Sequence, residues 1–267
     1  TWQVSVGEGW DAVAAEYLGR VAAQQDPDGT EGLVAAVDAT GDRRARIAQA
    51  VDAVRDQVHY VGLELGESAI VPYAPAKVLH RGFGDCKDQS NLLVTVLEEV
   101  GVPARLALIA AADPDPLHPD HPGLHAFDHA IVHLPEDDLW IDPTATWTHL
   151  GALPVSLAGH LALVIDPHTS ALVKVPANDP AAHHYAERRE LQLRHGAPAT
   201  YVETVEATGF LGEMVASNHV GDGASADLPG LRNYAEKIYG DTSPTVALTP
   251  SGAGVSTTTL RVAGSAP

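Results

Sequence analysis

One amphipathic helix followed by three short strands constrains the fold of this chain most strongly. From Cys86 to Val100 the apolar positions recur every three or four residues, which is the spacing of one helix face, and Gly101 and Pro103 end the pattern. Strand-like segments follow at residues 104–110, 130–134 and 139–141, the last two joined by turn residues. This order predicts an α+β fold in which the helix packs on an antiparallel sheet.

Helical spacing also recurs upstream, so residues 1–60 are predicted to be mainly helical, with helices at 9–25 and about 42–58. A short extended segment is expected at 60–63, and the prolines and glycines of 66–85 predict a loop. Beyond residue 176 the pattern changes to strands at 190–194, 199–206 and 257–262 and short helices near 211–218 and 231–239. We therefore predict a first domain at residues 1–178 and a smaller, mixed or β-rich domain at 179–267.

The charge of the chain excludes several classes of function. Its 16 basic and 35 acidic residues give a net charge of −19, which disfavours nucleic acid and anionic lipid because both are bound through Lys and Arg. No apolar run reaches the length of a membrane span, and the first residues lack the pattern of a signal peptide. No nucleic-acid partner and no membrane insertion are predicted. The localisation stays open, and one expectation is a segment of a larger secreted or cell-envelope protein.

Cys86 is the single cysteine, which excludes an internal disulfide and a cysteine-based zinc cluster. It lies where a glycine-rich segment turns into the helix, and the free N–H groups of a helix N-terminus stabilise an anion such as a thiolate. Asp85 or Asp88 would cap this helix, and Lys87 would be solvated. From these residues alone, two interpretations stay open: a nucleophile, or a small residue buried in the core.

Two later segments extend the pattern that begins with Gly84-Asp85-Cys86-Lys87-Asp88. Phe127-Asp128-His129 comes first, and Trp140-Ile141-Asp142-Pro143-Thr144 follows it. In this order the segments resemble bacterial transglutaminase-like domains, which are related to papain-like cysteine proteases, and the resemblance spans about residues 44–146. It implies a catalytic triad of Cys86, His129 and Asp142, in which the histidine takes the thiol proton and the aspartate orients the ring.

The remaining site residues are candidates only. On adjacent strands His129 and Asp142 could face one another. Taken alone, His129 would be an ordinary half-buried strand histidine, and Asp142 would be a turn former at a strand end. An oxyanion needs donors, of which the Cys86 N–H is the first. The second donor is expected from the preceding segment, where Gln57, His59 and Tyr60 are the candidates and Tyr60 is favoured.

Candidates for the substrate cleft are Arg81, Asp128 and Trp140. Arg81 could contact substrate or anchor the nucleophile loop, and Trp140 could belong to the core or to the cleft wall. Residues 113–125 carry four prolines, which predicts an irregular loop and suggests the hypothesis of a lid over Cys86.

Five histidines, at positions 118, 121, 125, 129 and 133, recur at spacings of three and four, as in a metal-binding helix. The prolines among them prevent a helix, and no aspartate-rich calcium loop occurs. We therefore predict no metal and no other cofactor.

These expectations favour a cysteine-dependent acyl-transfer enzyme that acts on protein or peptide amide bonds through a thioacyl intermediate. Resolution by water would make it a peptidase or amidase, and resolution by an amine would make it a transglutaminase. Hydrolysis is slightly favoured, because bacterial proteins that this chain resembles are more peptidase-like. The alternative is a non-catalytic protein- or peptide-binding module of a larger, cell-envelope protein, which the intact triad argues against.

Overall fold

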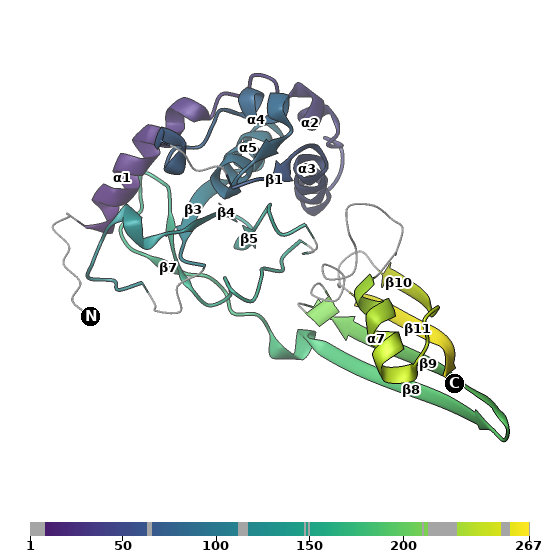
Figure 1. The fold of residues 1–267 in the computed structure, drawn as a ribbon. Coiled ribbons are helices and arrows are strands. Elements are labelled where there is room, and N and C mark those ends of the chain that lie inside the picture. The colour runs from purple at the N-terminus through teal and green to yellow at the C-terminus, as the bar shows by residue number, and fades with distance from the viewer. Residues whose placement is uncertain are drawn as a thin grey trace. The chain divides into compact units, whose positions relative to one another are not determined.

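The computed structural model describes residues 9–62, 66–111, 117–146, 148, 150–209, 211–212, 229–251 and 257–266 (Figure 1). The chain divides into two compact units, residues 1–146 with 150–178 and residues 147–149 with 179–267. Each unit contains a β-sheet and a hydrophobic core of its own.

The first unit is built on a five-stranded antiparallel sheet in the order β5-β4-β3-β6-β7. Its strands are β3 (Arg105–Ile109), β4 (His129–Leu134), β5 (Leu139–Ile141), β6 (Leu161–Val164) and β7 (Val173–Lys174). The first three lie where the sequence predicted strands, which confirms those predictions. Successive side chains of these strands point to opposite faces of the sheet, and both faces are buried by apolar residues.

Helices of the first unit surround α5 (Cys86–Glu99), which packs on β4 and contacts α3 and α4 (Figure 1). They are α1 (Trp10–Val21), α2 (Glu31–Ala35), α3 (Arg43–Gln57) and α4 (Pro75–Arg81), with 3-10 turns η1 (Ala22–Gln24), η2 (Gly66–Ala69) and η3 (Leu124–Ala126). The predicted helices at 9–25, 42–58 and 86–100 are confirmed, as is the packing of the cysteine-bearing helix on an antiparallel sheet. Among the described residues, no helix combines the length and apolar character that crossing a bilayer requires.

Burial of α5 exceeds what its sequence predicted. All residues from Cys86 to Leu97 are buried, although only one face of this stretch is apolar. The expectation that Lys87 is solvated is wrong, because its side chain is 6% exposed and its ammonium pairs with the buried Asp85 carboxylate. A buried charge needs such a partner, so the polar start of α5 belongs to the core.

The predicted loop at residues 66–85 is wrong in its centre, where α4 forms. Pro75 occupies the first turn, where its fixed φ suits a helix and its missing N–H is not needed. Gly82 ends the helix in the left-handed conformation, with φ of 69°. Two residues of β2 (Phe83–Gly84) then pair in parallel with β1 (His59–Tyr60). The predicted extended segment at 60–63 is strand only at Tyr60, and Leu63 lies outside the described residues.

Gly84, directly before the N-cap of α5, has no room for a side chain. A Cβ atom there would lie 2.7 Å from the Asp88 Cβ and 3.2 Å from the Val78 Cγ1. We expect Gly84→Ala to lower the free energy of unfolding by about 1–3 kcal/mol through overpacking. Gly19→Ala is the matched control, because Gly19 lies in α1 with open space around it and alanine favours a helix interior. Urea unfolding measures both, and equal stability of the two variants would contradict the expectation.

The second unit is a four-stranded antiparallel sheet in the order β10-β11-β9-β8, with α7 (Pro229–Tyr239) packed on it. Its strands are β8 (His184–Arg194), β9 (Ala197–Thr208), β10 (Thr245–Ser251) and β11 (Thr257–Ala266), preceded by the turn η4 (Pro180–Ala182). The predicted strands at 190–194, 199–206 and 257–262 and the helix at 231–239 are confirmed, whereas β10 was not predicted. The helix predicted near 211–218 lies largely outside the described residues.

Candidate active site

Cys86 is the first residue of α5, and the turn that precedes it is fixed by a capping box. The Asp85 Oδ1 accepts hydrogen bonds from the backbone N–H groups of Lys87 and Asp88, each at 3.1 Å, and the Asp88 Oδ2 accepts from the Asp85 N–H at 3.4 Å. These reciprocal bonds satisfy donors that a helix start otherwise leaves open. Cys86, 5% exposed, is thereby held at the positive end of the helix.

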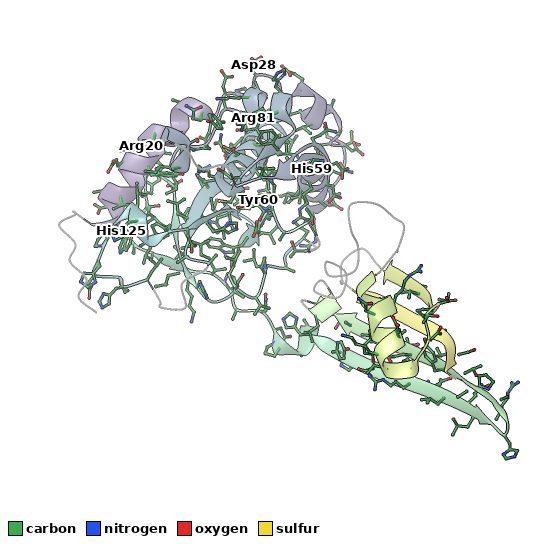
Figure 2. The ribbon with its side chains drawn as sticks, viewed as in Figure 1. Arg20, Asp28, His59, Tyr60, Arg81 and His125 are labelled. Atoms are coloured by element: carbon green, nitrogen blue, oxygen red, sulfur yellow. The ribbon has the colours of Figure 1, made fainter. Side chains whose placement is uncertain are left out.

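Asp88 ties this turn to the preceding chain. Its Oδ1 accepts from the Tyr73 N–H at 2.8 Å, and its Oδ2 lies 3.3 Å from the Arg81 Nη2. Burial raises the pKa of Asp88, although the hydrogen bond from Tyr73 acts in the opposite direction. The Arg81 guanidinium also lies over the rings of Tyr73 and Phe83. Of the two roles left open for Arg81 (labelled in Figure 2), these contacts support loop anchoring, and the prediction that it lines the substrate cleft is not supported.

His129 and Asp142 are joined by a hydrogen bond of 2.9 Å between the His129 Nε2 and the Asp142 Oδ2. The sequence had suggested that the two residues face one another directly, but they are not directly opposed in the sheet. The register pairs Val132 with Ile141, so continuing it would place Ile131 opposite Asp142. His129 lies two residues further along the same face and reaches Asp142 diagonally. The other carboxylate oxygen, Oδ1, accepts from the Thr144 N–H at 2.9 Å and from its hydroxyl at 2.7 Å.

The charges of this pair support each other. Burial alone would lower the pKa of His129. Hydrogen bonding and charge from Asp142 and Cys86 act more strongly in the opposite direction and raise this pKa to about 10. Burial raises the pKa of Asp142, yet the bonds from His129 and Thr144 bring it below its ordinary value. Since Nε2 faces Asp142, Nδ1 is the ring nitrogen left for the Cys86 thiol. The structure therefore joins His129 and Asp142 by a hydrogen bond and places Cys86 and His129 together in the wall of one cavity.

Arg55 holds the backbone that carries Asp142, and the sequence analysis missed it. Its Nη2 donates to the Asp142 carbonyl at 2.9 Å and its Nε to the Pro143 carbonyl at 3.3 Å. A signal existed, because Arg55 stands four residues after Val51 and three before Val58, near the inward face of α3. An arginine in that position needs acceptors, which the strand end provides.

Two further hydrogen bonds join the elements around Cys86. The Ser90 hydroxyl on α5 donates to the Ala130 carbonyl on β4 at 3.0 Å, next to His129. The Tyr17 hydroxyl on α1 donates to the Ile70 carbonyl at 2.9 Å, and burial, together with the nearby Cys86 and Asp85 charges, raises the pKa of Tyr17 well above its ordinary value. Neither residue stood out in the sequence, because a serine hydroxyl within a helix usually has a local partner, and the partner of Tyr17 lies 53 residues away.

A cavity of about 290 Å³ opens beside Cys86 and His129. Its walls come from α1, the segment around η2, the segment from η3 to Asp128, and strands β3 and β4. The segments on both sides of η3 contact α1: before η3, the Trp10 Nε1 donates to the Pro119 carbonyl at 2.6 Å, and after η3, the ring of Phe127 lies edge-on to Trp10. Residues 117–123 are irregular, as predicted, and 112–116 lie outside the described residues. The role of residues 113–125 as a lid over Cys86 stays a prediction.

The other cleft candidates separate clearly. Asp128 does line the cavity, and its Oδ1 accepts from the Ala111 N–H at 2.6 Å. Trp140 does not, and the prediction that it lines the cleft is corrected: it is 4% exposed, packs with Ile109 and Ile131 and stacks on His133. The strand directs it into the core on the sheet face away from α5, because successive side chains alternate between faces.

The predicted oxyanion donors lie near the nucleophile loop but do not line the cavity. β1 runs beside β2, with the His59 N–H donating to the Gly82 carbonyl and the Val61 N–H to the Gly84 carbonyl, each at 3.0 Å. Tyr60, which is labelled in Figure 2, is 54% exposed, and Gln57, the last residue of α3, is also exposed. Their oxyanion role stays a prediction.

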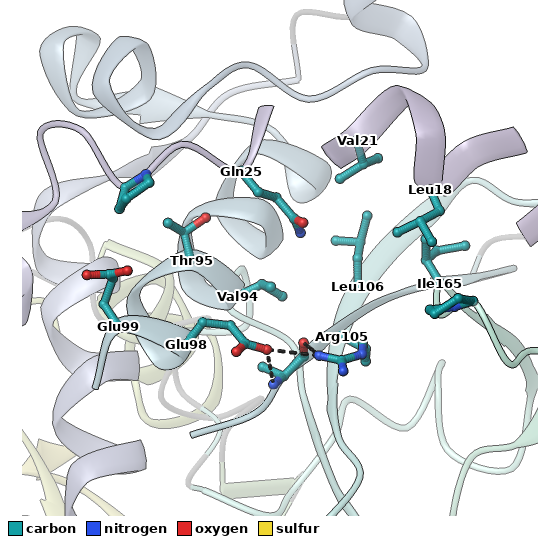
Figure 3. Close-up of a pocket in the computed structure, with 13 residues that line it drawn as sticks. Leu18, Val21, Gln25, Val94, Thr95, Glu98, Glu99, Arg105, Leu106 and Ile165 are labelled. Atoms are coloured by element: carbon teal, nitrogen blue, oxygen red, sulfur yellow. Dashed lines mark hydrogen bonds and ion pairs between the residues drawn. The ribbon is translucent and has the colours of Figure 1, made fainter. Parts of the chain in front are cut away.

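A second cavity of about 290 Å³ lies between α1, α5 and β3 (Figure 3). At its edge the Glu98 carboxylate accepts from the Ala104 N–H at 3.0 Å and from the Arg105 guanidinium at 2.9 Å. None of the three triad candidates lines it, so it is separate from the candidate active site.

The histidine series does not converge. His118 and His121 contact each other, with ring centroids 4.4 Å apart, whereas His133 packs against Trp140, where burial lowers its pKa. Within the part of the chain that the structure describes, no three His, Cys, Asp or Glu side chains are grouped to hold a metal.

Comparison with known proteins identifies the superfamily that this architecture resembles. The first unit combines an α+β fold with a buried cysteine at a helix start and a bonded His–Asp pair. Residues 31–151, which include all three, match the model of the transglutaminase-like superfamily and form a transglutaminase-like domain. The resemblance inferred from the sequence is confirmed at the level of this superfamily, and so is the fold class.

One solved structure is similar across nearly the whole chain. It is the crystal structure of a "putative protease" from Parabacteroides distasonis, with a TM-score of 0.52 and 13% sequence identity. The match covers 98% of this chain and 53% of the other, so this chain spans about half the length of that protein. At this identity the likeness concerns the fold alone. Among curated proteins, no significant match was found.

Proposed function

We propose that the first unit is a cysteine peptidase or amidase with Cys86 as nucleophile, His129 as general base and acid, and Asp142 as the residue that orients the ring. The observation that carries this proposal is that Cys86, at the start of α5, lines the same cavity as His129, whose ring is hydrogen-bonded to Asp142. A cysteine nucleophile needs a base within hydrogen-bond reach and a third group that fixes that base.

The reaction follows from these contacts. The Cys86 thiolate attacks the amide carbonyl carbon, and the tetrahedral anion that forms collapses with cleavage of the C–N bond. The leaving amine takes the proton from the His129 imidazolium, which leaves a thioester on Cys86. Water then adds to the thioester carbonyl, giving one proton to His129, and the C–S bond breaks to release the acid and regenerate the Cys86–His129 pair.

The two anions of this sequence require stabilisation. The backbone N–H of Cys86 at the start of α5 is the first proposed donor, since a helix N-terminus favours negative charge. The second donor is proposed from the segment Gln57 to Tyr60, which runs beside the nucleophile loop. Asp142 stabilises the charged imidazolium form of His129 while the Cys86 thiolate is present, in agreement with the raised pKa of His129.

Hydrolysis is favoured over transfer to an amine by the rim of the cavity. His125 (labelled in Figure 2) and Asp128 line it and are both exposed, so water has direct access to a thioester on Cys86. Transamidation requires an amine to compete with that water. Protein or peptide amides are therefore the proposed substrates, with hydrolysis as the proposed outcome.

Alkylation by iodoacetamide tests the nucleophile directly, because Cys86 is the only cysteine. An ordinary thiol is only about 1% ionised at about pH 6.5, whereas a thiolate paired with an imidazolium reacts throughout the range from about pH 6 to 8. We expect fast labelling at about pH 6.5 that slows by about tenfold or more in His129→Ala. The rate is followed by intact-mass spectrometry.

His133→Ala is the matched control for this experiment. His133 lies on the same strand as His129 but stacks on Trp140, so labelling of this variant should match the unsubstituted protein. Ordinary thiol kinetics that do not depend on His129 would overturn the catalytic proposal and favour the non-catalytic binding module. A peptide-cleavage screen beside an amine-incorporation assay then separates the reactions, and incorporation without cleavage would reject hydrolysis.

A further inference from the structure

We infer that the cavity beside Cys86 selects substrates with a bulky apolar side chain on the acyl part, next to the carbonyl that is attacked. This inference rests on the proposed function and names its substrate class. The acyl part becomes bonded to Cys86 in the thioester, and Cys86 lines the cavity, so the acyl side chain is the group that the cavity can hold.

The walls of the cavity are mainly apolar. Ala69, Ile70, Leu124 and Phe127 line it together with Leu108, which lies on β3 and is 7% exposed. These residues come from segments far apart in the sequence, so their convergence beside the thiol is a property of the fold. An apolar side chain that enters would lose contact with water on several sides at once, which is favourable in proportion to the area buried.

Ile70 is the wall residue that most needs an explanation. Its side chain is 45% exposed, although its backbone is fixed by the hydrogen bond from the Tyr17 hydroxyl. Tyr17 is itself 2% exposed and lines the same cavity. An exposed apolar side chain on a fixed backbone at the cavity wall is arranged to contact a ligand, because its area is available and little order is lost on binding.

Three of the basic and acidic side chains that line the cavity have partners in the protein, and the fourth, His125, lies exposed at its rim. The Lys87 ammonium pairs with Asp85, the His129 ring with Asp142, and the Asp128 carboxylate accepts from the Ala111 N–H. A charged substrate side chain in this cavity would be desolvated against apolar walls, which is unfavourable unless a partner compensates it. The cavity therefore discriminates against acidic and basic side chains.

The volume of the cavity sets a limit on the side chain. At about 290 Å³ it is near the lower end of the range for small-molecule sites, about 300–1,000 Å³. This space fits one bulky residue such as leucine or phenylalanine, and glycine would leave most of it unfilled.

Peptidyl chloromethyl ketones test this selectivity without a known substrate. In these probes the Cys86 sulfur displaces chloride, so a thioether forms and chloride leaves. The test would use N-blocked probes that carry Leu, Phe, Gly, Asp or Lys next to the ketone. Each probe's labelling rate would be divided by the iodoacetamide labelling rate of the same protein to give a ratio for that probe. The Leu and Phe ratios should exceed the Gly, Asp and Lys ratios by about tenfold or more.

Ile70→Ala provides the structural test. We expect it to lower the Leu and Phe ratios by about tenfold, because a wall contact is lost. Ile70→Asp should lower them further, and Ile238→Ala, which truncates a similarly exposed isoleucine (54%) on α7 of the second unit, should leave all ratios unchanged.

The two proposals fail in different ways. Fast, His129-dependent iodoacetamide labelling with equal ratios for all five probes would overturn the inference about selectivity alone. Ratios that favour Asp or Lys, or that do not respond to Ile70→Ala, would also overturn it. Slow iodoacetamide labelling without dependence on His129 would instead overturn the proposed function.

Discussion

Replacing Asp142 by asparagine is expected to lower kcat for peptide hydrolysis by about 10³–10⁴-fold while leaving the fold intact. The Asp142 Oδ1 accepts two hydrogen bonds from Thr144, and an asparagine can keep these with its carbonyl oxygen. Its NH₂ group would then face the His129 Nε2 and donate to it. The proton of the neutral ring would then sit on Nδ1, and a protonated Nδ1 could no longer accept the proton of the Cys86 thiol.

Asp166→Asn is the matched control for this substitution. Asp166 also binds a basic side chain, with its Oδ2 2.6 Å from the Arg105 Nε, but it lies outside the candidate active site. The kcat of Asp166→Asn should stay within about twofold of that of the unsubstituted protein, because Asp166 is not among the residues that line the cavity beside Cys86. Nitrogen NMR of His129 would report the ring tautomer directly. An Asp142→Asn variant that keeps more than a tenth of the activity would contradict the assigned role.

The same variant should change how stability depends on pH. The pKa of His129 is raised from 6.5 to about 10, so the pair contributes its full stability below about pH 6.5 and loses it as the pH rises toward 10. The lowered pKa of Asp142 acts at the other end, where stability present above pH 3.8 is lost as the pH falls further. The difference in unfolding free energy between the two proteins should therefore be largest between about pH 4 and 6.5.

Asp85→Ala is expected to lower the free energy of unfolding by about 3–5 kcal/mol. Asp85 is 2% exposed, caps α5 through two backbone N–H groups and pairs with the buried ammonium of Lys87. Removing the carboxylate would leave that ammonium buried without its counter-charge and would also remove the cap. Both losses fall on the turn that carries Cys86.

Asp42→Ala separates the two contributions. Asp42 also caps a helix, α3, but through a single exposed bond, in which its Oδ1 accepts from the Ala45 N–H at 2.7 Å. Loss of this cap should lower stability by about 1 kcal/mol. Urea denaturation of both variants gives the comparison. Equal losses would mean that the buried Lys87–Asp85 pair adds nothing beyond capping.

The elements with regular spacing could be predicted from sequence alone. The helix at 86–99 and the strands β3, β4 and β5 follow from apolar periodicity, and their order matched the family that the domain resembles. The short helix α4 could not be predicted in the same way. Its Pro75 and Gly82 are typical of turns as well as of helix ends, and seven residues give too little periodicity to decide.

Contacts between distant segments could not be predicted, because they depend on which faces the fold brings together. The sequence suggests a solvated Lys87, but the fold buries it against Asp85. For Trp140 the sequence left the core and the cleft wall open, and strand alternation places it in the core. Arg55 and Tyr17 reach partners 87 and 53 residues away in the sequence. Their roles required the tertiary structure.

The burial of α5 from Cys86 to Leu97 links the candidate active site to the integrity of its unit. The residues from Cys86 to Leu97 are enclosed by the sheet and by neighbouring helices, and Ser90 bonds the helix to the strand of His129. Local openings of a protein usually involve segments with few buried contacts, such as termini and loops. The thiol and imidazole therefore keep their relative positions through such fluctuations, and the reactive arrangement disappears only when the cooperative structure of the whole unit is lost.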